Sequence, residues 1–145
     1  MESKIAVRLA RVADVKSLMK LSQAVYGVEL MEELVLWKLK NNQELVIVAE
    51  FENELIGFAC AHVKMSFCRD ELLGEVTELY VEKAYRQKSV AKSMLLLLES
   101  YFKNHLVTKV TGLTVNEHEP CQYVFESLGY EKSDYCVYEK QICKI

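Results

Sequence analysis

Residues 74–101 read GEVTELYVEKAYRQKSVAKSMLLLLESY and carry the clearest structural signal in the chain. Residues 75–81 have the composition of a strand, and from Val90 to Tyr101 apolar side chains recur at helical spacing. A short basic loop joins the two predicted elements. A strand that leads into a helix in this way directs unpaired backbone N–H groups, and the positive end of the helix dipole, toward one point. The stretch therefore predicts an anion site.

The loop and the first turn of this helix also hold three cations, Arg86, Lys88 and Lys92. Positive side chains are unfavourable beside the N-terminus of a helix, because the dipole is positive there. We therefore expect a negative group, such as a phosphate, to complete the site. The ordinary alternative is a solvated basic loop of the kind that any α/β protein can carry.

One pattern in this stretch is similar to a known family motif. Leu79-Tyr80-Val81 is followed, after four intervening residues, by Arg86-x-x-Ser89-x-Ala91. This resembles motif A of the GNAT family of N-acetyltransferases, whose pattern is Arg/Gln-x-x-Gly-x-Gly/Ala and whose loop amides hold the pyrophosphate of acetyl-CoA. The resemblance implies acetyl-CoA as the cosubstrate. The cofactor-binding residues that it implies are Leu79, Tyr80, Val81, Arg86, Gln87, Lys88, Ser89, Val90, Ala91, Lys92, Asn116 and Phe125.

The resemblance extends over nearly the whole chain. Residues 8–14 are similar to the family's opening strand and first helix, and residues 113–116 and 125–130 to its fifth strand and closing turn. It implies one domain over residues 1–145 with an α/β GNAT fold. That fold is a mixed, mainly antiparallel sheet of six to seven strands, with helices on both faces and a splay between strands 4 and 5. The backbone of Leu79 and Val81 would bind the pantetheine arm like an added strand, and Asn116 would close the other side.

Hydrophobic periodicity along the chain agrees with such a fold. Apolar side chains at helical spacing predict helices over residues 12–25 and 30–37, the second of them after Gly27. Residues 45–51, 55–65 and 72–81 are predicted strands, joined by turns at 52–54 and near 69–70. The predicted order is β-α-α-β-β-β-α-β-α-β-β, so two further strands follow the last helix.

Two residues of the basic loop depart from the family pattern. Ser89 stands where Gly is usual, and Gln87 where a second Gly is frequent. Glycine there lets the backbone approach a phosphate closely and adopt conformations that a Cβ atom disfavours. The Ser89 hydroxyl can cap the helix or donate a hydrogen bond to a phosphate oxygen, so we expect CoA binding to be retained. The alternative is that Ser89 is only the N-cap of the helix.

Glu78 is the residue that we predict to activate the amine. An amine is protonated at pH 7 and must lose a proton before it attacks a thioester, and the resemblance places the thioester beside Glu78. Glu75 is the other carboxylate. Because it lies three residues away, we expect it on the opposite face of the strand. His62 and His118 are alternative bases.

The group that protonates the departing CoA thiolate is harder to assign from the sequence. The family often has a Tyr that protonates the departing CoA thiolate, and here Phe125 stands in its place. Phenylalanine has no proton to donate, so Tyr123 is the fallback acid, and water or Tyr130 are further sources. We expect Phe125 at the edge of a wet cleft, where Phe125→Tyr would keep the fold. Cys121 lies close to the predicted acetyl site and is either a nucleophile or a structural thiol.

The composition fits one domain without a metal site or a membrane span. The chain has 145 residues, 51% of them hydrophobic, and a net charge of -3. The charge, and the lack of interleaved basic and aromatic residues, argue against nucleic acid as a partner. The longest apolar run, residues 94–98, is too short to span a bilayer, and the five cysteines lack metal-ligand spacing. We therefore expect no metal site and no membrane partner, and the resemblance implies a reducing compartment and a cytoplasmic protein.

Acidic residues cluster in the segments that line the acceptor side in GNAT proteins. They are Glu29, Glu32, Glu33, Asp70, Glu71, Glu75, Glu117 and Glu119. A negative cleft would concentrate a small cationic acceptor such as an aminoglycoside or a polyamine. The predicted function is acetyl transfer from acetyl-CoA to a primary amine by direct attack in a ternary complex. The alternatives are a GNAT-fold module that binds CoA or acyl-CoA without turnover, and transfer to a protein or peptide amine. A homodimer is one expected assembly.

Overall fold

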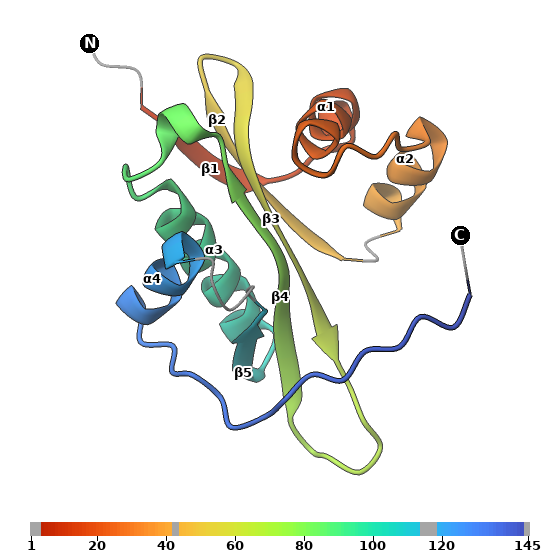
Figure 1. Ribbon diagram of the computed structural model, residues 1–145, viewed down its shortest axis with the longest axis vertical. Coiled ribbons are helices and arrows are strands. Elements are labelled where there is room, and N and C mark those ends of the chain that lie inside the picture. Colours follow the sequence, from red (N-terminus) through yellow and green to blue (C-terminus); the bar gives the residue numbers. More distant parts are fainter. Residues whose placement is uncertain (1–3, 42–43, 114–118, 144–145) are drawn as a thin grey trace.

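The computed structural model describes residues 4–41, 44–113 and 119–143, and its centre is a five-stranded sheet with the order β1-β2-β3-β4-β5 (Figure 1). The strands are β1 (Ala6–Leu9), β2 (Leu45–Phe51), β3 (Glu54–Lys64), β4 (Leu72–Val81) and β5 (Val107–Gly112). Neighbouring strands are antiparallel except β4 and β5, which run parallel. The predicted mixed, mainly antiparallel sheet is confirmed.

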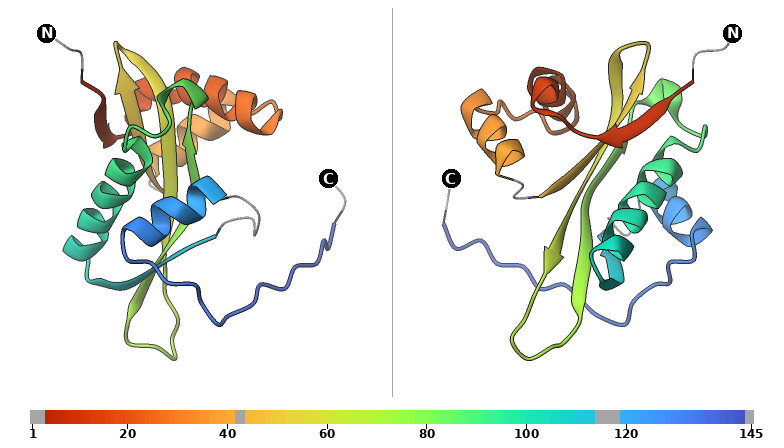
Figure 2. Two further views of the ribbon diagram at one scale, coloured as in Figure 1. Left: turned by 60° about the vertical axis from the view of Figure 1, so that its left-hand side comes forward. Right: turned by 180° about the vertical axis from the view of Figure 1, so that it is seen from behind.

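Helices cover both faces of the sheet, as the two views of Figure 2 show. Helices α1 (Val15–Tyr26) and α2 (Glu32–Lys40) lie on one face, and α3 (Val90–Asn104) and α4 (Glu119–Ser127) lie on the other. Two short 3-10 turns, η1 (Val12–Asp14) and η2 (Lys83–Tyr85), precede α1 and the loop before α3. The expectation of helices on both faces is thus confirmed. Within the described parts of the chain, no helix is long and apolar enough to cross a bilayer.

The denser core lies between α3 and the sheet. Met94, Leu95 and Leu98 of α3 are fully buried, because they recur on the one face of the helix that lies against the strands. Phe102 packs directly on the backbone of Gly74 in β4, where an added Cβ atom would lie 2.9 Å from the ring. The apolar spacing that predicted this helix therefore marks its buried face.

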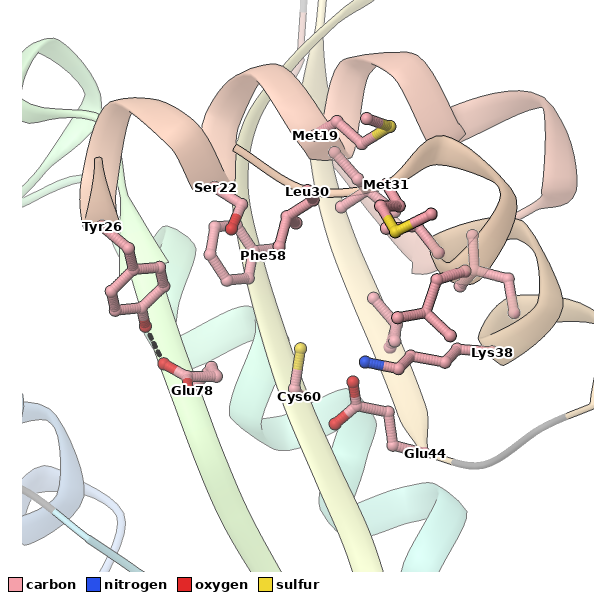
Figure 3. Close-up of a pocket in the computed structure, with 15 residues that line it drawn as sticks. Met19, Ser22, Tyr26, Leu30, Met31, Lys38, Glu44, Phe58, Cys60 and Glu78 are labelled. Atoms are coloured by element: carbon pink, nitrogen blue, oxygen red, sulfur yellow. Dashed lines mark hydrogen bonds between the residues drawn. The ribbon is translucent and has the colours of Figure 1, made fainter. Parts of the chain in front are cut away.

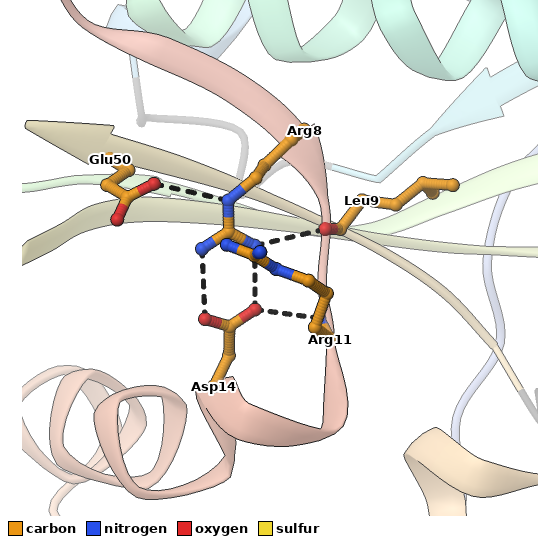
Figure 4. A network of polar contacts seen from close by, with 5 residues as sticks. All are labelled: Arg8, Leu9, Arg11, Asp14 and Glu50. Atoms are coloured by element: carbon orange, nitrogen blue, oxygen red, sulfur yellow. Dashed lines mark hydrogen bonds and ion pairs between the residues drawn. The ribbon is translucent and has the colours of Figure 1, made fainter. Parts of the chain in front are cut away.

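A charged network fixes the start of α1 against the sheet (Figure 4). Arg8 of β1 donates two hydrogen bonds to the Asp14 carboxylate, at 2.8 and 3.0 Å, and a third to Glu50 of β2 at 3.2 Å. The backbone N–H of Arg11 donates to the same Asp14 carboxylate at 2.7 Å. These donors hold the pKa of Asp14 below its usual value, with the Arg8 hydrogen bonds as the main cause. The network therefore sets the position of α1 over the sheet.

Within the described residues the sheet has five strands, and not the six to seven that we predicted. Residues 131–143, where further strands were expected, form neither helix nor strand. Their one ring contact with the sheet is that of Tyr135, whose ring lies 5.9 Å from the ammonium group of Lys109 in β5. A strand exists only where a neighbouring edge accepts its hydrogen bonds, and in Figures 1 and 2 this segment crosses the lower part of the sheet as an irregular chain and does not run alongside β5. The prediction was wrong because composition does not reveal whether an edge is in reach.

Candidate active site

The loop before α3 has the backbone shape that glycine favours, although neither of its key residues is glycine. Gln87 and Ser89 both adopt left-handed conformations, with φ of 64° and 63°. Such a conformation costs an ordinary residue about 1–2 kcal/mol, so the surrounding structure must enforce it. Ser89 occupies the N-cap position of α3, yet its side chain makes no capping hydrogen bond. The loop shape is therefore maintained without help from the Ser89 hydroxyl.

One of the cations around this loop, Arg86, also holds the loop in place. Arg86 donates from Nε to the carbonyl of Val81 at 2.8 Å, and its guanidinium lies 5.7 Å from the centre of the Tyr80 ring. The Arg86 side chain thereby ties the loop to the end of β4. Lys92 is exposed in the first turn of α3, which holds no acidic residue. The unpaired N–H groups at the start of α3 and the surrounding positive charge fit a pyrophosphate.

Beside this loop, the C-terminal half of β4 has one open edge. The pairing of β4 with β5 ends at Val76 and Gly112, while β4 continues to Val81. Residues 77–81 thus have no β5 partner within the described chain, which leaves backbone groups available for a ligand. Val81 and Val90 are buried, at 7% and 4% exposure, so only their backbones can face a bound molecule. The predicted splay and the role of Asn116 stay predictions, because residues 114–118 lie outside the described residues.

Glu75 and Glu78 lie on the same face of β4, contrary to the prediction from their spacing. Cys60 of β3 pairs with Glu78, and His62 pairs with Glu75, so a step of two residues on β3 matches a step of three on β4. The extra residue of β4 is Thr77, which forms a β-bulge. Because Cys60 and His62 share one face of β3, their two partners share it as well.

The two carboxylates nevertheless have different surroundings. Glu75 forms an ion pair with Lys64 on the neighbouring strand. Glu78 instead accepts a hydrogen bond from the hydroxyl of Tyr26, the last residue of α1 (Figure 3). Partial burial raises the pKa of Glu78 above its usual value, which makes its carboxylate a better proton acceptor near neutral pH. Glu78 is therefore the better candidate for a base, and His118 lies outside the described residues.

Glu78 forms part of the wall of a pocket between the sheet and the α1–α2 pair. The pocket has a volume of about 310 Å³, and α1, α2, β2, β3 and β4 all contribute to its lining. Most of its lining side chains are apolar, and Figure 3 shows Glu78 on one side and Lys38 and Glu44 on another. Cys60 also lines the pocket, where burial raises the pKa of its thiol. The pocket is thus mostly apolar, with a carboxylate beside the open edge of β4.

Of the acidic residues expected around the acceptor, those whose side chains the structure describes do not line this pocket. Glu32 and Glu33 of α2 line a separate, shallower hollow with Met31 and Leu36. Glu71 accepts a hydrogen bond from Thr108 of β5 at 2.9 Å. Of the predicted set, Glu117 lies outside the described residues, and no side-chain position is described for Glu119.

The predicted surroundings of the acid are also corrected. Phe125 is a core residue with 8% exposure, and its ring lies so close to Gly112 that a Cβ atom there would be 2.4 Å from Cζ. It does not lie at the edge of a wet cleft. Tyr123, by contrast, is 78% exposed. Tyr130 donates its hydroxyl to Glu99 at 2.8 Å, and burial raises its pKa. Cys121 is half-buried, and burial raises the pKa of its thiol, which disfavours the nucleophilic thiolate.

Sequence reasoning missed Tyr26, Lys38 and Glu44. Tyr26 and Glu78 are 52 residues apart in the chain, and no motif connects them. The one local signal near Tyr26 is Gly27, which ends α1 in a left-handed conformation with φ of 67°. That signal predicts where the helix stops, but it says nothing about what the last side chain contacts. Among the described residues, no cluster of three or more His, Cys, Asp or Glu side chains could hold a metal ion.

A comparison with protein families decides what kind of domain this is. Residues 13–130 match the model of the acetyltransferase (GNAT) family. The chain belongs to the GNAT acetyltransferase family. It is therefore an acetyltransferase, and acetyl-CoA is its acetyl donor. The loop before α3 and the open edge of β4 are the features of this GNAT domain that fit the donor.

Solved structures show the same GNAT fold. The aminoglycoside N-acetyltransferase AAC(6')-Iy in complex with CoA has a TM-score of 0.82 at 17% identity, over 99% of this chain and 98% of that one. The aminoglycoside acetyltransferase meta-AAC0020, from an uncultured soil metagenomic sample and in complex with sisomicin, has a TM-score of 0.84 at 16% identity, over 97% of each chain. Ribosomal-protein-alanine N-acetyltransferase from Brucella melitensis biovar Abortus 2308 has a TM-score of 0.80 at 17% identity, over 96% and 100%.

At such low identities these likenesses extend to the fold alone. A sequence search among curated proteins finds no match. The acceptor of this GNAT domain must therefore be inferred from its own pocket.

Proposed function

We propose that this GNAT domain transfers the acetyl group of acetyl-CoA to the primary amine of a small cationic acceptor by direct attack in a ternary complex. The observation that carries the proposal is the position of Glu78. Its partly buried carboxylate lines the pocket under α1 and α2 and lies on the part of β4 whose edge is open. An amine held in the pocket and a thioester held along β4 would meet beside this carboxylate.

The proposed reaction needs one proton acceptor and one proton donor. Glu78 takes a proton from the bound ammonium group, and the free amine nitrogen attacks the thioester carbonyl carbon. The new C–N bond forms while the C–S bond breaks, and the nitrogen gives its second proton to water as the amide forms. The CoA thiolate takes up a proton from water or from Tyr123. A thiolate is a tolerable leaving group, so the absence of a hydroxyl at Phe125 does not prevent the reaction.

The similar structures support an amine acceptor without naming it. One is AAC(6')-Iy in complex with the bisubstrate analog CoA-S-monomethyl-acetylneamine, and another is meta-AAC0020 with sisomicin. The likeness to ribosomal-protein-alanine N-acetyltransferase keeps a peptide amine as the second candidate acceptor. An aminoglycoside, a polyamine and a peptide terminus all carry primary amines that are protonated at neutral pH.

The test is a thiol-release assay with acetyl-CoA and a panel of primary amines, performed on Glu78→Gln. We expect the substitution to lower kcat/KM by about 10²- to 10⁴-fold at pH 7. The loss should shrink as the pH rises, because more of the amine is then already deprotonated. Glu75→Gln is the matched control, since Glu75 lies on the same face of β4 but is ion-paired with Lys64. Equal losses in the two variants would contradict the assignment.

Tyr26→Phe tests whether the hydroxyl of Tyr26 positions and tunes Glu78. A hydrogen bond donated to the charged form of a carboxylate lowers its pKa, so removing the donor should raise the pKa of Glu78 further. The acidic limb of the kcat/KM profile should then move to higher pH, while the plateau at high pH changes little. A profile that falls uniformly at every pH would indicate a structural role instead.

We also propose that two copies of the chain pair through residues 131–143. Tyr138 and Ile142 in this segment are 95% and 88% exposed, and β5 is an edge strand of the sheet. An open edge offers unpaired N–H and C=O groups to another chain, and exchange of equivalent segments gives a symmetric dimer. Light scattering should show a dimer for the full chain and a monomer for a chain that ends at residue 130. A monomeric full chain would overturn this proposal.

For the compartment, we propose the cytoplasm. All five cysteines are free, and unpaired thiols persist in reducing compartments. Fractionation of the source cells should recover the protein with the cytosolic fraction. Recovery from an extracellular or periplasmic fraction would contradict the assignment.

A further inference from the structure

We propose that the acceptor of this site is a monoamine carried on an apolar body, such as an aryl or branched alkyl group, and not a polyamine or an aminoglycoside. The inference rests on the proposed function and names the substrate class of the same pocket. Three observations carry it: the unburied apolar residues of α2, the arrangement of charges in the pocket, and its size.

Helix α2 buries none of its residues, although five of its nine side chains are apolar. Leu34 and Trp37 are 48% and 52% exposed, and Met31, which precedes the helix, is 67% exposed. Leu34 and Met31 line the pocket. Covering exposed apolar side chains with an apolar ligand makes the free energy of binding more favourable, by about 25 cal/mol per Å² of surface removed from water. The α2 side of the pocket is therefore suited to an apolar occupant.

The charges in the pocket favour one ammonium group and disfavour a second. Glu78 can pair with the reacting ammonium group. The lining holds one further carboxylate, Glu44, and one cation, Lys38, which Figure 3 shows on the same side of the pocket. A second cation of the acceptor would meet the positive charge of Lys38 close to Glu44, or an apolar wall, where a charge without a partner is costly. A polycation matches this arrangement poorly, whereas an amine at one end of an apolar body matches it well.

The size of the pocket favours an acceptor whose apolar body is compact. Its volume of about 310 Å³ lies at the lower end of the range of roughly 300–1,000 Å³ that is usual for small-molecule sites. A single aromatic ring or a short branched chain fits such a volume, whereas a compound of several amino sugar rings would extend beyond it. We therefore infer that the pocket holds the apolar body while the amine lies beside Glu78.

The experiment compares 2-phenylethylamine and 3-methylbutylamine with spermidine and sisomicin in the thiol-release assay. We expect kcat/KM for the two apolar amines to exceed that for spermidine and sisomicin by about tenfold or more, the discrimination that a few buried methylene groups supply. A higher kcat/KM for spermidine or sisomicin than for either apolar amine would overturn the inference while leaving the proposed function intact.

Leu34→Glu tests the role of the pocket wall. Leu34 and Leu96 are both 48% exposed on helices, but Leu96 lies on α3 and does not line the pocket, so Leu96→Glu is the matched control. We expect Leu34→Glu to lower kcat/KM for 2-phenylethylamine by about tenfold or more and to raise it for spermidine. Leu96→Glu should leave both values unchanged. Equal effects of the two substitutions would overturn the inference.

A binding measurement separates the inference from the proposed function. If no amine releases thiol, the proposed function fails, and calorimetry with CoA present then decides the inference alone. Binding of 2-phenylethylamine that is weakened by Leu34→Glu but not by Leu96→Glu supports it. Absence of binding, or binding that both variants retain, overturns it.

Discussion

Helices α3 and α2 lie on opposite faces of the same sheet and pack against it to very different degrees. α3 buries Val90, Met94, Leu95, Leu98 and Phe102, whereas α2 buries none of its residues. Tightly packed α3 follows the strained loop that fits the donor, whereas loosely packed α2 forms part of the wall of the proposed acceptor pocket. Strained conformations persist only where the surrounding structure enforces them, while a pocket wall can adapt to a ligand only where packing is loose.

The largest predicted difference in stability comes from making the same change, Leu to Ala, in α3 and in α2. Leu98→Ala in α3 removes a fully buried side chain and should lower the free energy of unfolding by about 3–5 kcal/mol. Leu34→Ala in α2 removes a side chain that is 48% exposed, so its cost should stay below about 1 kcal/mol. Denaturant unfolding of both variants measures the difference. Similar losses would show that α2 is packed as tightly as α3.

Next in size is the effect of breaking the network that attaches α1 to the face of the sheet that it shares with α2. Asp14→Asn leaves Arg8 without its main ionic partner and should cost about 2–3 kcal/mol at pH 7. The pKa of Asp14 is lower in the folded chain than in the unfolded one, so its contribution is present above about pH 4 and is lost as the pH falls through the folded pKa. The stability curves of wild type and variant should therefore converge in acid. A difference that is constant from pH 7 to pH 2 would contradict this reading.

A hydroxyl added to the tightly packed face should have a smaller effect. Phe125→Tyr would place a hydroxyl on Cζ, the ring atom that lies against Gly112, and should destabilise the fold by about 1–3 kcal/mol. Tyr123→Phe removes a hydroxyl from a side chain on the same helix that is 78% exposed, and its effect on stability should be within about 0.5 kcal/mol. Thermal unfolding compares the two. Unchanged stability of Phe125→Tyr would mean that the core under α4 can relax.

The smallest predicted effect on stability concerns the loop before α3. Ser89→Gly removes the strain of a left-handed serine and should stabilise the fold by about 0.5–1 kcal/mol. Ser93→Gly, one turn further along α3, should instead destabilise it by about 0.5 kcal/mol, because Ser93 is inside the helix. Calorimetry should show CoA binding that is preserved or tighter in Ser89→Gly. A large loss of CoA affinity would show that the Ser89 hydroxyl is itself a ligand of CoA.

Local patterns in the sequence were enough for most of the fold. The strand over residues 45–51 matches β2, and a second helix, α2, follows Gly27 as predicted. The strand, loop and helix of residues 75–101 also occur where the spacing of apolar residues placed them. These features follow from backbone geometry within a few residues: side chains alternate along a strand and recur every 3.6 residues along a helix. Such periodicities can be read from the chain without knowing what each element contacts.

The details that matter for chemistry came only from the tertiary structure. The bulge at Thr77 brings Glu75 and Glu78 to one face, Tyr26 reaches Glu78 from another element, and Phe125 is buried against Gly112. Each of these depends on how segments far apart in the sequence pack together. A single extra residue in one strand reverses the alternation beyond it, and it is the pairing of neighbouring strands, not local composition, that reveals where that residue lies.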